Sequence, residues 1–123
     1  MTVTESGFAT DTGVRRSEHI VRSLEQIARA RDAGVDVRGY YHWSLMDNFE
    51  WALGWKPRFG LYSVNAAEGD YTRRKTQGAE TYQEIIARRL IPDEMAASLG
   101  GTGPMSPLAE TAKAVDELCL PVE

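Results

Sequence analysis

The stretch "GVDVRGYYHWSLMDNFEWALGWKPRFGLYSV", residues 34–64, decides the fold of this chain. Valines and aromatic residues in its first part, residues 35–43, predict a β-strand. A long aromatic loop, residues 44–59, follows the strand. The loop and the strand end together hold all three tryptophans of the protein, and they also hold the acids Asp47 and Glu50. Burying acids among tryptophans without partners is unfavourable, so this composition needs a specific explanation.

The residues before this stretch predict a strand and a helix. Residues 2–5, "TVTE", are β-prone and run into the Ser-Gly turn. Ser17 is an expected N-cap of a helix whose apolar residues recur at helical spacing, and Gly34 is its expected C′ residue. The order strand, helix, strand predicts a βαβ unit with parallel strands and a right-handed crossover.

The rest of the chain predicts shorter elements around one main region. We expect a short strand at 59–65, a polar connector at 66–75 and a helix at 77–90 that Pro92 stops. A Gly/Pro linker is expected at 93–107, and a possible last helix in the tail. The predicted organisation is a partial barrel region (1–92), a linker (93–107) and a C-terminal tail (108–123).

Composition excludes several classes of protein. The 123 residues carry a net charge of -4, so nucleic acid is not an expected partner. No stretch approaches 18 apolar residues, so no membrane span is expected. One cysteine and two histidines without metal-ligand spacing predict no disulfide framework, metal or cofactor. The first ten residues do not resemble a signal peptide, and we expect a cytoplasmic protein.

Two glutamates occupy places where sites form in folds built from βα units. Glu5 ends the first strand and Glu50 follows the second, and sites in such folds collect at the carboxyl ends of strands. Tryptophan faces suit the apolar face of a sugar, and carboxylates suit its hydroxyls. The alternatives are that Glu5 caps a turn, that Trp43 belongs to the core and that Glu50 is a solvated loop acid. The residues alone leave a polar-aromatic ligand site and these alternatives open.

Three motifs together resemble family 1 glycoside hydrolases, the retaining β-glucosidases and β-galactosidases. The motifs are "VTESG" at 3–7, the long tract at 34–64 and "RRK" at 73–75. The similarity spans about residues 2–90. It implies an α/β fold, namely the C-terminal portion of a (β/α)8 TIM barrel with strands 7–8 and helices 7–8, incomplete in this chain. The family also has a cis peptide bond at the step that corresponds to Trp43–Ser44.

The resemblance implies a role for five residues. Glu5 corresponds to the catalytic nucleophile. Trp43 corresponds to the aromatic platform under the glycone, Glu50 to the acid that binds glycone hydroxyls, and Trp51 to a tryptophan whose indole N–H binds another hydroxyl. Phe59 corresponds to a weaker contact near the glycone. In the retaining mechanism a carboxylate attacks the anomeric carbon, and a second carboxylic acid protonates the leaving oxygen.

The sequence departs from the family pattern in ways that bear on activity. The acid/base glutamate lies in an Asn-Glu-Pro motif in the family, and these 123 residues contain no such motif. Ser6 and Asn65 replace Asn and Asp, which are mild changes. We therefore expect a fragment that is inactive as an isolated β-glycosidase but carries the glycone site of a β-glycoside or oligosaccharide substrate.

Two other functions are compatible with the residues. The chain is alternatively a non-catalytic carbohydrate-binding module, or an interaction fragment that docks on a chain supplying the remaining barrel strands. Glucose, galactose and fucose are all open as the glycone.

Overall fold

The computed structural model describes residues 1–106. The elements, in chain order, are β1 (Thr2–Ser6), α1 (Gly13–Asp32), β2 (Gly39–His42), the 3-10 helix η1 (Trp51–Leu53), β3 (Tyr62–Asn65), the 3-10 helix η2 (Ala66–Glu68), β4 (Asp70–Lys75), α2 (Gln77–Arg88) and α3 (Asp93–Leu99). The predicted tail helix lies outside the described residues. Within residues 1–106, no helix is both long enough and apolar enough to cross a membrane.

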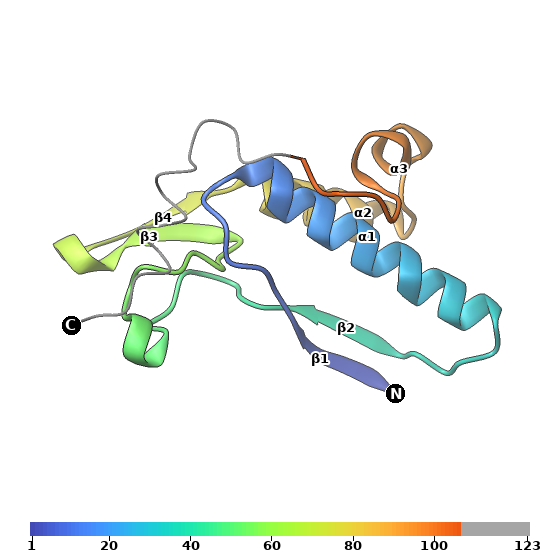
Figure 1. The fold of residues 1–123 in the computed structure, drawn as a ribbon, viewed down its shortest axis with the longest axis horizontal. Helices are drawn as coiled ribbons and strands as arrows, with labels where there is room; N and C mark the ends of the chain where they lie inside the picture. The colour runs from blue at the N-terminus through green and yellow to red at the C-terminus, as the bar shows by residue number, and fades with distance from the viewer. Residues whose placement is uncertain (107–123) are drawn as a thin grey trace.

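The predicted βαβ unit is confirmed. β1 and β2 pair in parallel, and α1 connects them along one face of the pair (Figure 1). The second strand is shorter than expected, because residues 35–38 lie outside it. Val37 is buried while Val35 is exposed. The two valines therefore do not belong to a longer strand, and only Val37 packs into the interior.

Helix α1 begins earlier and ends where the sequence predicts. Its first residue is Gly13, and Ser17 is a fully buried interior position rather than the N-cap. At the other end Gly34 adopts a φ of 90°. Its N–H donates to Arg31 O at 2.9 Å, and the N–H of Val35 donates to Ala30 O at 2.9 Å. This pair of bonds is a Schellman motif, which satisfies carbonyls at the helix end and confirms Gly34 as C′.

The core is formed by buried side chains of α1 and α2 together with Leu61, just before β3. Ile20 and Val21 of α1 are completely buried. Small residues bring the helices close, since a Cβ added at Gly78 would lie 2.6 Å from Arg16 Cγ. Thr81 donates a hydrogen bond to Ser17 Oγ at 2.9 Å across the same interface. The amphipathic pattern of both helices therefore serves one shared core.

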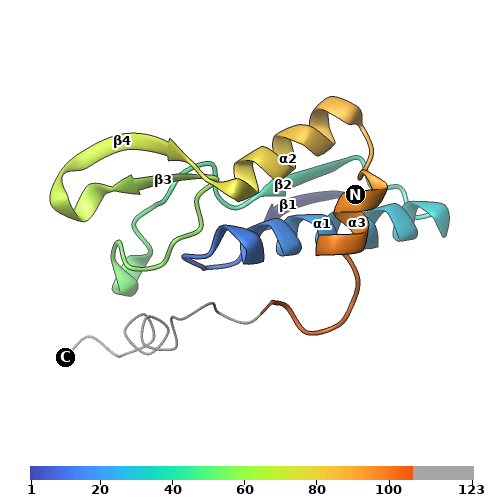
Figure 2. The same ribbon diagram turned by 90° about the horizontal axis from the view of Figure 1, so that it is seen from above.

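The expected polar connector at 66–75 contains a strand. β4 pairs antiparallel with β3 and forms a hairpin that projects from the body (Figure 2). Residues 71–75 of this strand are exposed, so the sequence carries no alternation of apolar and polar residues that would predict it. An ion pair of 2.6 Å between Asp70 and Arg74 lies along it.

Helix α2 ends earlier than predicted, and a further short helix follows it. Thr76 caps α2, accepting a hydrogen bond from Ala79 N at 3.3 Å. Arg89, in a left-handed conformation, ends the helix before Pro92 is reached. Pro92 instead precedes α3, so the stretch predicted as a linker begins with a helix.

Residues 100–106 also run back along α1 rather than as an isolated linker. Arg22 donates to Gly103 O at 2.6 Å and to Leu99 O at 3.3 Å. The buried carboxylate of Glu18 accepts from the backbone N–H of Ser106 at 3.0 Å. Charged residues one turn apart on α1 thus hold this glycine-rich segment in place.

Candidate active site

A cavity of about 440 Å³ opens where β1 ends and where the loop after β2 begins. Glu5 comes from β1, and Trp51 begins η1. The other lining residues belong to the strand-end loop. The full lining is Glu5, Trp43, Asn48, Phe49, Glu50 and Trp51. Segments separated by about forty residues therefore meet at the carboxyl ends of two paired strands, as the βαβ unit predicts.

A bulge in β1 turns Glu5 toward this cavity. Val3 pairs with Tyr40 and Ser6 pairs with His42, so Thr4 and Glu5 stand opposite the single residue Tyr41. In a regular ladder Glu5 would share a face with His42, because side chains alternate with a period of two. The extra residue puts Ser6 on that face instead and leaves Glu5 on the opposite one. Bulges of this kind re-aim side chains beside active sites.

A glycine allows the ends of the two strands to touch. A Cβ at Gly7 would lie 2.1 Å from the carbonyl oxygen of Trp43, closer than any side chain tolerates. The N–H of Trp43 donates to Ser6 O at 2.9 Å at the same place. The Trp43–Ser44 peptide bond is cis, as the family resemblance implies. The backbone at Ser6 and Gly7, directly after Glu5, is therefore held against Trp43.

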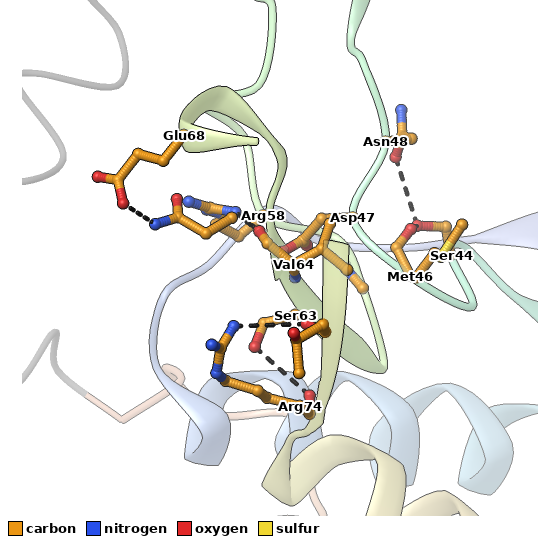
Figure 3. Close-up of polar contacts among 12 residues, drawn as sticks. Ser44, Met46, Asp47, Asn48, Arg58, Ser63, Val64, Glu68 and Arg74 are labelled. Atoms are coloured by element: carbon orange, nitrogen blue, oxygen red, sulfur yellow. Dashed lines mark hydrogen bonds and ion pairs between the residues drawn. The ribbon is translucent and has the colours of Figure 1, made fainter. Parts of the chain in front are cut away.

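Asp47 fixes the loop that carries the rest of the cavity lining (Figure 3). This acid is only 3% exposed. Its Oδ1 accepts from Gly60 N at 2.9 Å, and its Oδ2 accepts from Val64 N at 3.2 Å and from Arg58 Nη1 at 3.1 Å. Both oxygens are thus satisfied, which is the condition under which a carboxylate can be buried. Asp47 serves the structure, while its near neighbour Glu50 faces the cavity.

A buried arginine supports the same loop. Arg16 of α1 is almost fully buried and donates to Thr10 O at 2.6 Å and to Arg58 O at 2.7 Å. Burial lowers the pKa of Arg16, and the nearby negative charge of Asp47 opposes that shift. The Arg16 bonds join α1 to the loop backbone at Arg58, whose side chain in turn binds Asp47.

Glu50 is oriented by an amide from within the same loop. Asn48 Nδ2 donates to Glu50 Oε2 at 2.8 Å. Asn48 Oδ1 lies 3.3 Å from Ser44 Oγ, a contact drawn in Figure 3. Glu50 is half-buried beside the exposed ring of Phe49, which meets Trp55 edge to face at 5.6 Å between centroids. The loop therefore offers a carboxylate with a fixed neighbour next to aromatic surfaces.

The tryptophans leave ring surface available to a ligand. Trp43 is 38% exposed and Trp51 is 86% exposed. Trp51 also has a φ of 44°, in the left-handed region that L-residues seldom adopt. Such conformations persist where the surrounding structure enforces them, and they cluster at functional sites. Neither ring is buried in the core. The alternative that Trp43 is a core side chain is therefore not supported.

The structure brings together four of the five residues that the sequence singles out. Glu5, Trp43, Glu50 and Trp51 line the cavity, and Phe59 does not. The backbone carbonyl of Phe59 instead accepts from Ser44 N at 3.2 Å. Sequence reasoning missed Asn48 and Phe49 as lining residues. Asn48 stands two positions before Glu50, and this spacing could have predicted that its amide contacts the Glu50 carboxylate.

Two histidines pack on the helix side of the strands, behind the cavity. The rings of His19 and His42 are 6.1 Å apart, and His19 Nε2 lies 3.1 Å from Ser6 Oγ. Both ring nitrogens of His42 are buried, and within residues 1–106 they have no hydrogen-bond partner. Burial, followed by the charge of His19, lowers the pKa of His42 to about 4. Burial lowers the pKa of His19 as well.

This pair predicts a loss of stability in mild acid. An unfolded histidine has a pKa near 6.5, so the unfolded chain binds more protons than the folded chain between that pH and about 4. We expect the free energy of unfolding to be highest above pH 6.5 and to fall as the pH drops toward 4. Urea unfolding of wild type and His42→Phe from pH 4.5 to 7.5 checks this. The variant should lose much of the acid-side slope, and an unchanged slope would contradict the assignment.

Within the described residues, no group of three or more His, Cys, Asp or Glu side chains is arranged to hold a metal ion. The cavity itself is lined by carboxylates, an amide and aromatic rings. Two carboxylates from neighbouring strand ends can address one bound molecule, one as an attacking or charged group and the other as an acceptor of hydroxyl hydrogens.

The chain is similar in sequence to a known family of enzymes. The model of "Glycosyl hydrolase family 1" matches residues 3–90. A β-galactosidase of Saccharolobus solfataricus is 41% identical over 111 residues, covering 88% of this chain and 22% of that enzyme. A bifunctional β-D-glucosidase/β-D-fucosidase of Bifidobacterium breve is 42% identical over 101 residues, covering 71% of this chain and 21% of the relative.

Solved structures give the same result. A β-glycosidase from Pyrococcus horikoshii aligns with a TM-score of 0.77 at 40% identity, covering 82% of this chain and 23% of that one. The chain thus spans about a fifth of the length of the relatives it matches. The matched residues include all of β1 except Thr2, all of β2, the bulge that bears Glu5 and the whole cavity loop. This chain belongs to glycosyl hydrolase family 1.

Proposed function

We propose that this chain carries the glycone site and the nucleophile of a retaining β-glycosidase. The observation that supports the proposal most directly is the meeting of Glu5 and Glu50 in one cavity with Trp43 and Trp51, in a chain of this family. Trp43 provides the surface for the apolar face of the sugar ring. Glu50 and the indole N–H of Trp51 bind its hydroxyls.

Glu5 is the proposed nucleophile. One of its carboxylate oxygens attacks the anomeric carbon, the bond from that carbon to the leaving oxygen breaks, and a glycosyl ester forms on Glu5. The leaving oxygen takes the bonding electrons and needs a proton from a second carboxylic acid when the leaving group is an ordinary alcohol. No Asn-Glu-Pro motif occurs in these 123 residues, so none of them is proposed as the proton donor.

The alternative is a carbohydrate-binding fragment without chemistry. Trp43, Glu50 and Trp51 suffice to hold a sugar, and neither sugar stacking nor acceptance of hydroxyl hydrogens requires Glu5 to react. The exposed ring faces of the two tryptophans support binding under either function.

Sugar binding by the chain tests what the two functions share. We expect calorimetric titration with glucose or galactose to show binding that Trp43→Ala weakens about tenfold, a loss of ~1.4 kcal/mol, because the ring loses its apolar partner. Tyr71→Ala is the control, since Tyr71 is an exposed aromatic residue of β4 and lies outside the cavity lining. Equal weakening by both substitutions would argue against Trp43 as the sugar platform. Reaction at Glu5 separates the two functions.

A further inference from the structure

One oxygen of the Glu50 carboxylate is already occupied. Asn48 Nδ2 donates to Oε2 at 2.8 Å. Within residues 1–106 the other oxygen, Oε1, accepts no hydrogen bond. Since Glu50 lines the cavity, Oε1 is the oxygen left for a ligand. The two oxygens of the carboxylate therefore differ before a ligand binds: Oε2 is bonded to Asn48, and Oε1 is available to the ligand.

The chemistry of the pair decides which way the Asn48 amide faces. Turning the amide over would place Oδ1 against Glu50 Oε2, and two acceptors would then face each other. In the observed orientation Nδ2 faces the carboxylate and Oδ1 faces Ser44 Oγ at 3.3 Å. The hydroxyl of Ser44 donates mainly to Met46 O at 2.7 Å, so the Ser44 contact is the weaker of the two that hold the amide.

The amide is attached to a rigid part of the molecule. Ser44 is buried, and its N–H and C=O both bond to the 59–61 backbone, to Phe59 O at 3.2 Å and from Leu61 N at 2.8 Å. Asp47, the residue before Asn48, is the buried acid that binds Gly60, Val64 and Arg58. Asn48 thus connects a fixed segment to a half-buried carboxylate at the cavity wall.

We propose that Asn48 is the positioning residue for Glu50: its amide holds Oε2 and thereby presents Oε1 to a hydroxyl of the bound sugar. The inference rests on the proposed function, because it takes the cavity to hold a glycone. Asn48 acts through Glu50 and needs no contact with the ligand. A carboxylate held in one rotamer loses less side-chain freedom on binding, and so binds more tightly.

Asn48→Asp gives a test that a merely structural role would not pass. At pH 7.5 two carboxylates face each other and repel, and we expect affinity for methyl β-D-glucoside to fall about tenfold. As the pH drops, the pair takes up one proton, and the O–H of the introduced carboxylic acid then donates to Glu50 as the amide did. The affinity of Asn48→Asp relative to wild type should therefore recover between pH 7.5 and 5. Asn48→Ala should lose affinity at every pH without recovery.

The chain offers a matched control for this substitution. Asn65, the last residue of β3, donates through Nδ2 to Glu68 Oε2 on η2. It makes the same amide-to-carboxylate bond outside the cavity lining. Figure 3 shows Glu68 well away from Asn48. Asn65→Asp should leave sugar affinity unchanged at every pH. A ratio to wild type that stays constant with pH in Asn48→Asp, or a recovery of the same size in Asn65→Asp, would overturn the proposal.

A measurement without sugar separates this proposal from the proposed function. In NMR spectra of the unliganded chain, Glu50→Ala should shift the side-chain amide resonances of Asn48 and leave those of Asn65 in place. An unshifted Asn48 amide overturns the positioning role whether or not sugar binds. If the amide shifts and wild type binds no sugar, the contact stands and the proposed function fails. If wild type binds sugar and Asn48→Asp binds equally well at pH 7.5, only the positioning role fails.

Discussion

Glu5→Gln is expected to abolish covalent capture of an activated sugar. 2,4-Dinitrophenyl 2-deoxy-2-fluoro-β-D-glucoside carries a leaving group that departs as a stable anion and needs no proton. The carboxylate of Glu5 can therefore attack the anomeric carbon and release dinitrophenolate without the missing acid/base residue, and the fluorine slows hydrolysis of the ester. Glutamine cannot form this ester as a carboxylate does, so labelling should fall to background.

Mass spectrometry of peptides from the treated chain measures this effect. Wild type should gain one deoxyfluoroglucosyl unit on the peptide that contains Glu5, with one equivalent of dinitrophenolate released. Glu68→Gln, an exposed acid of η2, should label like wild type. A label on another acid, or equal labelling of Glu5→Gln, would refute the nucleophile assignment. Sugar binding without any label would favour the carbohydrate-binding alternative.

Asp47→Ala is expected to produce the largest loss of stability of any single change considered for this chain. The substitution leaves two buried backbone N–H groups without their acceptor and removes the carboxylate from Arg58, which keeps its bond to Val64 O. Leaving one buried donor without its acceptor costs about 1–3 kcal/mol, so the loss of both N–H acceptors should cost about 2–6 kcal/mol. The total stability of a small domain is about 5–15 kcal/mol, so the variant should be close to unfolding.

Urea unfolding followed by tryptophan fluorescence, together with amide hydrogen exchange of Gly60 and Val64, checks the role of Asp47. Asp47→Asn should also destabilise the chain, because its NH2 group must face a donor on one side. The control is Asp70→Asn, which removes an exposed ion pair with Arg74 and should change stability little. Unchanged protection of the Gly60 and Val64 amides in Asp47→Ala would refute this role.

The sequence predicts those parts of the fold that rest on local chemistry. The apolar spacing of α1 and the need for a left-handed residue at Gly34 predict the helix and its end. β4 was missed because residues 71–75 are exposed and charged residues follow one another along it. α3 was missed because seven residues before a glycine-rich segment carry little helical pattern.

The candidate site shows a similar division. The places of Glu5 and Glu50 after strands predict that the two acids can face one cavity, and the family resemblance adds Trp43 and Trp51. The cavity of the structure is lined by all four residues. Composition could not distinguish Asp47 from Glu50, since the partners of Asp47 lie 13 and 17 residues away along the chain. The bulge at Thr4 and Glu5 could not be predicted from the residues of β1 alone, because a register shift depends on both paired strands.

The close approach at Gly7 has a consequence for protein engineering. A Cβ there would meet Trp43 O at 2.1 Å, and a Cβ at Gly60 would meet Asp47 N at 2.4 Å. Mutant libraries that aim to change sugar preference should therefore leave both glycines untouched and diversify Phe49, whose side chain is exposed and lines the cavity. Gly7 and Gly60 therefore belong to the part of the site that does not tolerate substitution, whereas an exposed lining residue such as Phe49 can be varied.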